Sequence, residues 1–396
     1  MILPVPKRRI AILGCTGSVG TQALSILEEH EDRFDVCMLA AHTSIAGLET
    51  AAGRHHPAAA CLTGTAEPAG LPAKSELFRG PEGLLAALEA SAPDTVLNAI
   101  TGAAGLAASE WTLRRGLTLA LANKESLVVA GEYLLPLARD NGATILPVDS
   151  EHCAIFQCLN GEDRGSVRRI WLTGSGGPFR ERPLDTFASI TREEALKHPT
   201  WSMGPRITIG SATMMNKAFE VLEARWLFDL APEQIRVVIH PQSIVHSMVE
   251  FCDGSMLAQC GVPDMRVPIL FCLGYPDRLP FDFQPFDPLK WRALEFTPFE
   301  PSRYPAVDLA YEAMRRGGDA GSVLNAADEV ATAAFLDGKI AFHQITEIAA
   351  AVMRARPTLP LTSLQAVHDA DRDGRARAAE LLHQSNADAT DSDRDT

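Results

Sequence analysis

The chain has 396 residues, of which 46% are hydrophobic and 22% charged, and its formal net charge is −14. This length is too great for one hydrophobic core and predicts two or three domains. The negative charge argues against partners such as nucleic acid or an anionic membrane surface, which require clustered Lys and Arg. It does not argue against a small phosphorylated ligand, because one local basic pocket is enough to bind it.

The eight cysteines form no C-x-x-C pair and show no zinc-like clustering with histidine, which indicates reduced thiols. The apolar stretch that follows Lys7-Arg8-Arg9 stops at Gly14, which is too short for the core of a signal peptide. No apolar run approaches the roughly 20 residues that span a bilayer. We therefore expect a soluble, cytoplasmic protein.

A glycine-rich turn follows the first predicted strand. Residues 9–13 have a strand pattern, and the turn from Gly14 to Gly20 leads into a helical run over residues 21–30. This order is typical of a dinucleotide-binding fold, in which the glycines let the backbone approach a pyrophosphate at the helix N-terminus. The spacing is G-x-x-G-x-x-G rather than G-x-G-x-x-G, so a plain tight turn into a helix remains an alternative.

The second predicted strand, residues 34–40, should end where the ribose of an adenosine lies. An NAD enzyme usually places Asp or Glu at that point to bind the ribose 2′-hydroxyl. This chain offers His42, Thr43 and Ser44 and no acid. The pattern therefore favours NADP over NAD, although His42 could also be an ordinary exposed loop residue.

Two further strands, residues 95–100 and 116–122, alternate with helical segments. This alternation predicts an α/β fold with a parallel, doubly wound, Rossmann-like sheet. Asn123, Lys124 and Glu125 follow the second of these strands, a suitable place for the nicotinamide half of a cofactor. A helix capped by Ser126 would explain the same residues without a function.

Two carboxylates and a hydroxyl follow the apolar run 143–148. Asp149, Ser150 and Glu151 would lie just beyond the carboxyl end of a strand, where open parallel sheets bind their ligands. The two carboxylates can coordinate Mg²⁺ or Mn²⁺ if a third arrives from elsewhere. The alternative is a helix N-cap, with Glu151 in the first helical turn.

The middle of the chain offers an anion site and a lid. A glycine-rich turn with Ser175 follows a strand at residues 171–173, and such turns present several amides to an anion. The loop 197–205 carries Trp201 and could close over a ligand with Gly204 as its hinge. A turn without a ligand and a loop that packs its Trp onto the core are the alternatives.

Residues 211–226 predict one helix capped by Ser211. Asn216 and Glu220 share a face of this helix, and Lys217 precedes Glu220 by three residues. A solvated face with a Lys-Glu pair is the ordinary explanation. In the functional interpretation, the side chains of Ser211, Asn216 and Lys217 would hold a phosphate. Glu220 would be the third carboxylate of the cation site.

Residues 236–251 have strand character and predict a β-ribbon with residues 255–259, turning at Asp253-Gly254. Such a sheet could form a subunit interface, and His240 and His246 within it are interpreted as structural residues. Residues 276–302 predict an extended linker, because they are rich in Pro, Asp and Phe and lack periodicity.

The remaining residues predict a helical bundle and a tail. Helical patterns cover residues 306–316, 322–336, 343–355 and 364–382. The expected domains are therefore an NADPH-binding Rossmann-like domain (1–149), a central α+β catalytic domain with metal site, flap and dimer interface (150–275), the linker (276–302), the C-terminal α-helical bundle (303–384) and a disordered tail (385–396).

These segments, in this order, resemble 1-deoxy-D-xylulose 5-phosphate reductoisomerases, the NADPH- and metal-dependent enzymes of non-mevalonate isoprenoid biosynthesis. The resemblance runs from about residue 9 to about residue 350, and its most specific stretch is Ser211 to Lys217. The other motifs that carry it are Gly14–Gly20, Asn123–Ser126, Asp149–His152, Gly174–Phe179 and His198–Gly204. His42, and Gly210 in place of the usual Asp or Asn, depart from the pattern.

The resemblance implies a role for each matching residue. It implies that Asp149, Glu151 and Glu220 bind the divalent cation, Mg²⁺ or Mn²⁺. It implies that Thr16, Gly17, Ser18, Val19, Thr43, Ser44, Asn123, Glu125 and Gly204 contact NADPH. It implies that Lys124, Ser150, Glu151, Ser175, His198, Ser211, Asn216, Lys217 and Glu220 contact the substrate. The implied catalytic set is Lys124, Asp149, Glu151, His198, Glu220 and Trp201, the last on the flap.

The implied activity is a rearrangement of 1-deoxy-D-xylulose 5-phosphate to an aldehyde. NADPH then reduces that aldehyde to 2-C-methyl-D-erythritol 4-phosphate, with a homodimer as the expected assembly. Two alternatives remain at this point. One is an NADP-dependent dehydrogenase of a phosphorylated hydroxy acid without isomerisation, and the other is an NADPH-binding sensor without catalysis.

Overall fold

The computed structural model describes residues 6–65, 70–197 and 204–392, with side chains as far as residue 384. The chain forms two compact units, which are described separately. The first unit contains the chain up to Ser126, Leu134–Asn160 and Gly261–Phe286. The second contains Leu127–Tyr133, Gly161–Cys260 and the chain from Asp287 onward. Within the described ranges, no helix is both long enough and apolar enough to cross a membrane.

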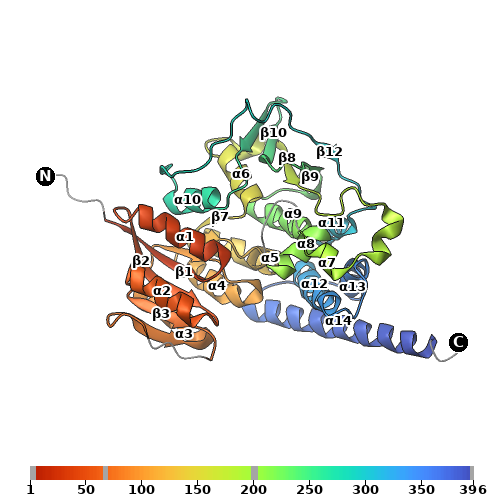
Figure 1. Cartoon of the computed structure of the whole chain (residues 1–396), viewed down its shortest axis with the longest axis horizontal. Helices are drawn as coiled ribbons and strands as arrows, with labels where there is room; N and C mark the ends of the chain where they lie inside the picture. Colours follow the sequence, from red (N-terminus) through yellow and green to blue (C-terminus); the bar gives the residue numbers. More distant parts are fainter. Residues whose placement is uncertain (1–5, 66–69, 198–203, 393–396) are drawn as a thin grey trace. The chain divides into compact units, whose positions relative to one another are not determined.

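A seven-stranded parallel sheet forms the centre of the first unit (Figure 1). Its strand order is β4-β3-β2-β1-β5-β6-β7. The strands are β1 (Arg8–Leu13), β2 (Phe34–Ala41), β3 (Ala59–Leu62), β4 (Glu76–Arg79), β5 (Thr95–Asn98), β6 (Thr118–Leu121) and β7 (Thr144–Pro147). Because β2 and β5 flank β1, the strand order reverses there, and ligands bind at such a switch point. The predicted doubly wound, Rossmann-like sheet is confirmed.

Helices cover this sheet because its strands are apolar on both faces. Ile10 and Ile12 of β1 belong to one buried cluster with Leu27, Leu48 and Leu273. These leucines come from α1 (Ser18–Glu29), α2 (Ile45–His55) and α10 (Arg266–Gly274), so these three helices share one face of the sheet. The other helices of the unit are α3 (Gly80–Ser91), η1 (Gly102–Gly105), α4 (Leu106–Arg114), α5 (Glu125–Asp140) and α6 (Ser150–Cys158). The α5 helix contributes residues to both units.

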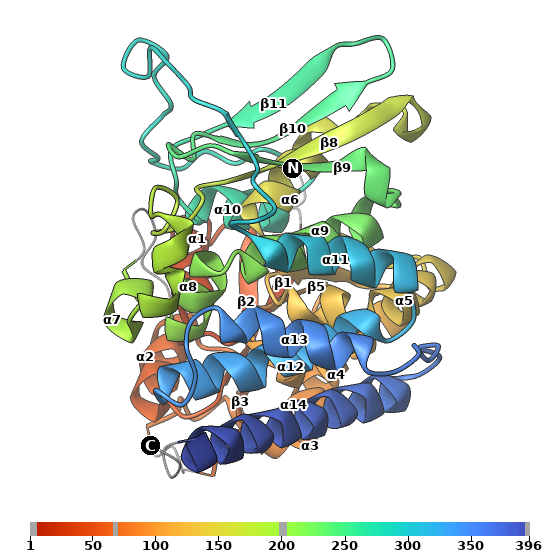
Figure 2. The ribbon, with the colours of Figure 1, turned by 90° about the vertical axis from the view of Figure 1, so that its right-hand side faces the viewer.

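The second unit combines a five-stranded sheet with a helical bundle (Figure 2). The strand order is β11-β10-β8-β9-β12, and β8 and β9 are its parallel pair. The strands are β8 (Val167–Gly174), β9 (Ile235–Ile239), β10 (Val245–Phe251), β11 (Met256–Cys260) and β12 (Thr297–Pro298). The segments between the longer elements contain the short helices η2 (Arg164–Ser166), η3 (Leu184–Ser189), α7 (Arg192–Ala195) and η4 (Pro232–Gln234). The bundle contains α11 (Pro305–Arg316), α12 (Ala320–Leu336), α13 (Gln344–Arg354) and α14 (Leu364–Ser392).

The strand predicted over residues 236–251 is two strands, β9 and β10. The fully buried ring of His240 stabilises the turn between them, because its Nε2 accepts hydrogen bonds from the amides of Ile244 and Val245, both at 3.1 Å. Ser243 in the same turn has a positive φ of 52°. His240 is therefore structural, as expected. The predicted ribbon of β10 and β11 is confirmed, and Gly254 at its turn has a φ of +87°.

The single helix predicted over residues 211–226 was wrong, because two helices cover this segment. They are α8 (Pro205–Ala212) and α9 (Met215–Phe228). Met214 lies between them with a φ of 60°, a left-handed conformation that ends the first helix. Ser211 therefore lies in the last turn of α8 and does not cap a helix.

The last helix is longer than the sequence pattern predicts. The α14 helix continues to Ser392, through residues whose polar, acidic composition predicted disorder from residue 385 onward. Alanines at positions 387 and 389 favour helix in this segment despite its polarity. Residues 385–392, for which the sequence predicts a disordered tail, are assigned to this helix, and residues 393–396 lie outside the described chain.

Candidate functional site

The turn after β1 is packed too closely for any residue but glycine at two of its positions. A Cβ on Gly14, whose φ is +82°, would lie 2.6 Å from the carbonyl oxygen of Ala99. A Cβ on Gly20 would lie 2.3 Å from the carbonyl oxygen of Gly14. The α1 helix then begins at Ser18 with Gly17 as its N-cap, so no N-cap side chain competes for the first amides. Such a helix N-terminus is suited to a phosphate.

The two cofactor segments predicted from sequence meet next to this turn. A Cβ placed on Gly47 of α2 would lie 2.7 Å from both Ser44 Oγ and Thr16 Cγ2, so these two side chains lie together over the glycine. His42 is exposed, and its Nδ1 lies 2.9 Å from Thr63 Oγ1. This loop after β2 therefore presents a ring nitrogen and hydroxyl groups, and it contains no carboxylate.

Asn123 joins the ends of two neighbouring strands. Its side chain is buried at the end of β6, and its Nδ2 donates to the carbonyl oxygen of Gly102, beyond β5, at 2.9 Å. The amide of Ser126 donates to Asn123 Oδ1 at 2.9 Å. Ser126 is thus a donor to Asn123 and not the N-cap of α5, which the alternative interpretation required. Glu125 is the first residue of that helix.

Asp149 both caps a helix and pairs with the ammonium group of Lys124. It is the N-cap of α6, where its Oδ1 accepts a hydrogen bond from the amide of Glu151 at 3.3 Å. Its Oδ2 lies 2.8 Å from Lys124 Nζ, and its Oδ1 lies 3.2 Å from His152 Nδ1. Ser150 Oγ donates to Glu151 Oε2 at 2.6 Å. The cap predicted as an alternative is therefore present, and the same carboxylate also lies against the ammonium of Lys124.

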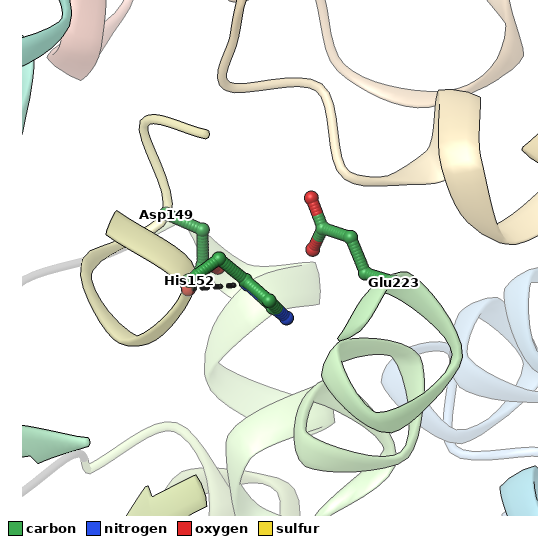
Figure 3. Close-up of side chains that lie close together, drawn as sticks. All are labelled: Asp149, His152 and Glu223. Atoms are coloured by element: carbon green, nitrogen blue, oxygen red, sulfur yellow. Dashed lines mark ion pairs between the residues drawn. The ribbon is translucent and has the colours of Figure 1, made fainter. Parts of the chain in front are cut away.

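The neighbours of Asp149 determine its charge. Burial by itself would raise the pKa of this carboxyl, but the ammonium of Lys124 and the His152 ring together hold it well below the ordinary value. Figure 3 shows the pair of Asp149 and His152 as a dashed line, with Glu223 of α9 as the third labelled side chain. An ionised carboxylate of this kind is a ligand that a hard cation prefers. The sequence interpretation gave His152 no role, although its i, i+3 spacing from Asp149 is a usable signal.

The predicted Lys-Glu pair of the second unit is buried and not solvated. Lys217 Nζ forms an ion pair with Glu220 Oε2, and the two side chains are only 4% and 2% exposed. Asn216 Nδ2 donates to Glu220 Oε1 at 2.6 Å. Removing two charges from water is unfavourable by several kcal/mol per ion. A pair in such a place is therefore a candidate functional site.

Two close-packed glycines place the other predicted phosphate-binding residues, Ser175 and Ser211, near the segment of the Lys217–Glu220 pair. A Cβ on Gly174, at the end of β8, would lie 3.2 Å from Lys217 Cε. A Cβ on Gly177 would lie 2.9 Å from the carbonyl oxygen of Ser211. Ser175, between these glycines, accepts a hydrogen bond at Oγ from the Gly177 amide at 3.3 Å. The second unit therefore gathers Ser175, Ser211, Asn216 and Lys217 from three separate segments.

Of the other residues predicted for the site, the structure describes all but His198 and Trp201. Gly204 is the N-cap of α8 in the second unit. His198 and Trp201, and with them the predicted flap, lie outside the described residues. Lys124, Asp149, Ser150 and Glu151 belong to the first unit, whereas Glu220 belongs to the second.

Comparison with known proteins gives the same family along almost the whole chain. Residues 10–131 match the model of 1-deoxy-D-xylulose 5-phosphate reductoisomerase, residues 145–228 match its C-terminal domain, and residues 260–377 match the DXP reductoisomerase C-terminal domain. The 1-deoxy-D-xylulose 5-phosphate reductoisomerase of Anaeromyxobacter dehalogenans is 46% identical over 377 residues, covering 94% of this chain and 96% of that protein. The protein of the same name from Trichlorobacter lovleyi is 45% identical, covering 95% and 98%.

Solved structures agree with this result. The reductoisomerase of Zymomonas mobilis in complex with NADPH has a TM-score of 0.89 and 41% identity, covering 95% of this chain and 99% of that chain. A DOX-P reductoisomerase in complex with NADPH, fosmidomycin and magnesium has a TM-score of 0.90 and 37% identity, covering 96% and 99%. This chain therefore belongs to the 1-deoxy-D-xylulose 5-phosphate reductoisomerase family.

Proposed function

We propose that this chain converts 1-deoxy-D-xylulose 5-phosphate into 2-C-methyl-D-erythritol 4-phosphate, using NADPH and a divalent cation. The observation that carries the proposal is the likeness, over 96% of the chain, to a reductoisomerase structure that holds NADPH, fosmidomycin and magnesium. The chain is thus an oxidoreductase of isoprenoid precursor biosynthesis. Its own residues support each part of this activity.

Asp149, Glu151 and Glu220 are the proposed ligands of the cation. Their donor set consists of carboxylate oxygens, which fits Mg²⁺ or Mn²⁺ and not a soft metal. Asp149 meets the further requirement of being ionised. When bound, the cation supplies Lewis-acid polarisation of the substrate's oxygen atoms.

The proposed NADPH site follows the switch point of the first unit. Gly17, Ser18 and Val19 present the start of α1 to the pyrophosphate, and Thr16 lies beside Ser44 in the loop after β2. The absence of a carboxylate at positions 42–44 supports a 2′-phosphate at the ribose. The remaining proposed contacts are Thr43, Asn123, Glu125 and Gly204. When bound, NADPH supplies the hydride that reduces the aldehyde formed by rearrangement.

The proposed phosphate site lies at the start of α9. Met214, the N-cap of this helix, makes no side-chain cap hydrogen bond, and Asn216 and Lys217 follow in the first turn. The helix N-terminus and the buried ammonium of Lys217 both favour an anion. Ser175 and Ser211 add hydroxyl groups. Binding the phosphate away from the reacting carbons provides energy that orients the substrate and excludes water.

The other proposed catalytic groups act directly on the substrate. Lys124, which pairs with Asp149 in the structure, would also donate a hydrogen bond to an oxygen of the bound substrate. Ser150 and Glu151 would orient the neighbouring hydroxyl groups of the substrate. His198 would contact the substrate, and Trp201 would cover it. These last two assignments rest on the family motif alone.

The chain is also proposed to act as a cytoplasmic homodimer. The edge strand β11 exposes Met256 and Leu257, which are 47% and 43% exposed, and it forms a ribbon with β10. An exposed apolar edge strand is a typical place for a second copy to pair. Sedimentation analysis tests this assembly, since a chain that remains monomeric at micromolar concentration would contradict it.

The activity is tested by mixing the purified protein with 1-deoxy-D-xylulose 5-phosphate, NADPH and Mg²⁺. The expected result is loss of the reduced nicotinamide absorbance, formation of 2-C-methyl-D-erythritol 4-phosphate, and arrest of the reaction by a chelator. Consumption of NADPH that survives the chelator, and survives Asp149→Asn, would instead indicate a dehydrogenase without isomerisation. Binding of NADPH without any turnover would indicate a sensor.

A further inference from the structure

Arg206 connects a short helix to the helical bundle. It is the second residue of α8, and its guanidinium lies 2.8 Å from Glu329 Oε1 and donates to Asn325 Oδ1 at 3.2 Å. Both partners belong to α12. Asn325 is fully buried, and its Nδ2 donates to Glu329 Oε1 at 3.3 Å. Arg206 is therefore held by two neighbouring groups, one of them charged.

Glu329 continues the connection to a third helix. Its second oxygen, Oε2, accepts a hydrogen bond from Arg375 of α14. Arg375 is fixed in turn by Asp371, at 2.7 Å and 3.0 Å to its two oxygens. The side chain of Glu329 is only 15% exposed, so water screens these pairs less than it screens ordinary surface pairs. We call the four side chains of Arg206, Glu329, Asp371 and Arg375 the α8 anchor.

The α8 helix needs such an anchor. It has eight residues, no side-chain cap at its N-terminus and no acidic residue in its first turn. A helix of this length is not stable by itself in water. A cation at a helix N-terminus is also unfavourable toward the helix dipole. The position of Arg206 is therefore explained by its tertiary partners and not by any benefit within its own helix.

The same helix carries a residue of the proposed phosphate site. Ser211 lies five residues after Arg206, about 7.5 Å along the axis at 1.5 Å per residue. Gly177 packs against the carbonyl of Ser211, since a Cβ on Gly177 would lie 2.9 Å from that oxygen, so the turn that carries Ser175 is in contact with the same helix. The anchor therefore acts on the place where the phosphate is expected to bind.

We propose that Arg206 is a positioning residue for the substrate's phosphate, acting through Glu329 to hold α8, and with it Ser211, in place. This inference rests on the proposed function and deepens it. It assigns to the C-terminal helices α12 and α14 a part in substrate binding.

The first experiment compares Arg206→Met with wild type. We expect the KM for 1-deoxy-D-xylulose 5-phosphate to rise about tenfold, with kcat changed less than about threefold. The KM for NADPH should rise less than the KM for the substrate, because the start of α8 carries only one proposed NADPH contact, Gly204. Arg206→Lys keeps one ion pair to Glu329, so its KM should lie within about threefold of wild type. The matched control is Arg372→Met on α14, whose side chain is 73% exposed and pairs with Asp369 of the same helix. It should leave all three constants unchanged.

Equilibrium binding of inorganic phosphate, measured by dialysis, separates this inference from the proposed activity because it needs no turnover. Arg206→Met and Glu329→Gln should each weaken phosphate binding about tenfold, and the double variant should be no weaker than the worse single variant. Glu329→Gln also supplies the result if Arg206→Met does not fold. Phosphate affinity equal to wild type in either folded variant, or additive effects in the double variant, overturns the proposal. So does a wild-type chain that binds no phosphate.

Discussion

Lys124 Nζ lies 2.8 Å from Asp149 Oδ2, so the carboxylate proposed as a cation ligand already has a positive charge beside it. The two positive charges, ammonium and metal ion, therefore compete for one carboxylate in a partly buried place. A substrate that offers Lys124 another partner relieves this competition. Cation binding and substrate binding are then expected to support each other.

Replacing Lys124 by Gln should separate binding of the cation from catalysis. Without substrate, the variant should bind Mn²⁺ about tenfold more tightly, because the competing charge is absent, while kcat/KM falls on the order of a hundredfold. Electron paramagnetic resonance of free Mn²⁺ measures the affinity. Lys339→Gln removes an exposed lysine that pairs with Asp337 and is the control. Unchanged or weaker Mn²⁺ binding in the Lys124 variant would contradict the competition.

Glu220→Gln should affect both activity and stability. The change removes a proposed cation ligand and breaks the buried ion pair between Glu220 and Lys217. We expect kcat to fall about 10²- to 10³-fold. The free energy of unfolding should fall by about 3–5 kcal/mol, the range for breaking a buried pair. Urea denaturation measures the second effect, and Glu233→Gln, at an exposed position, is the control. A variant as stable as wild type would show that the buried pair does not contribute to the free energy of unfolding.

His42→Asp should shift the cofactor preference toward NADH. An acid at the end of β2 can accept a hydrogen bond from the ribose 2′-hydroxyl and repels a 2′-phosphate. We expect the ratio of kcat/KM for NADPH over NADH to fall on the order of a hundredfold. His56→Asp introduces the same charge at an exposed position whose φ of 48° suits Asp, and it should leave the ratio unchanged. If both variants keep the wild-type ratio, position 42 does not face the 2′-phosphate.

Glu312 should contribute to stability in a pH-dependent manner. Its hydrogen bonds from Arg354, at 2.7–3.2 Å, hold the pKa of this carboxyl below its ordinary value in the folded chain. A lowered folded-state pKa gives stability that is present above the unfolded pKa of about 4.5 and is lost as the pH falls through the folded value. The difference in unfolding free energy between wild type and Glu312→Gln should therefore shrink on acidification below that point. A difference that is constant from neutral pH to pH about 3 would contradict the shift.

The first unit could be predicted from sequence because its signals are local. Apolar strands, glycines at positions 14 and 20, and alternating helices each specify their own structure, and together they specify a parallel sheet. The break between α8 and α9 could not be predicted in this way. Met214 adopts a left-handed conformation without being Gly or Asn, so tertiary packing and not local preference determines it.

The candidate site was predicted less completely, for a related reason. The i, i+3 spacing of Lys217 and Glu220 is the same on a solvated surface and in a core, so spacing alone could not show that the pair is buried. Burial depends on Gly174, which lies more than forty residues earlier in the sequence and packs against Lys217. For Asp149, the sequence predicted a helix cap and a charged site as alternatives. The structure shows that the same carboxylate does both, because it accepts the Glu151 amide and pairs with Lys124.

The alternation of the chain between its two units has a consequence for its synthesis. The first unit is interrupted after Asn160 and is completed only by residues 261–286, whose helix α10 packs against the same sheet face as α1. A nascent chain that has emerged from the ribosome as far as residue 160 therefore lacks one of the three helices that cover this face of the sheet. The partly made protein must keep this surface from aggregating until more than a hundred further residues have been translated.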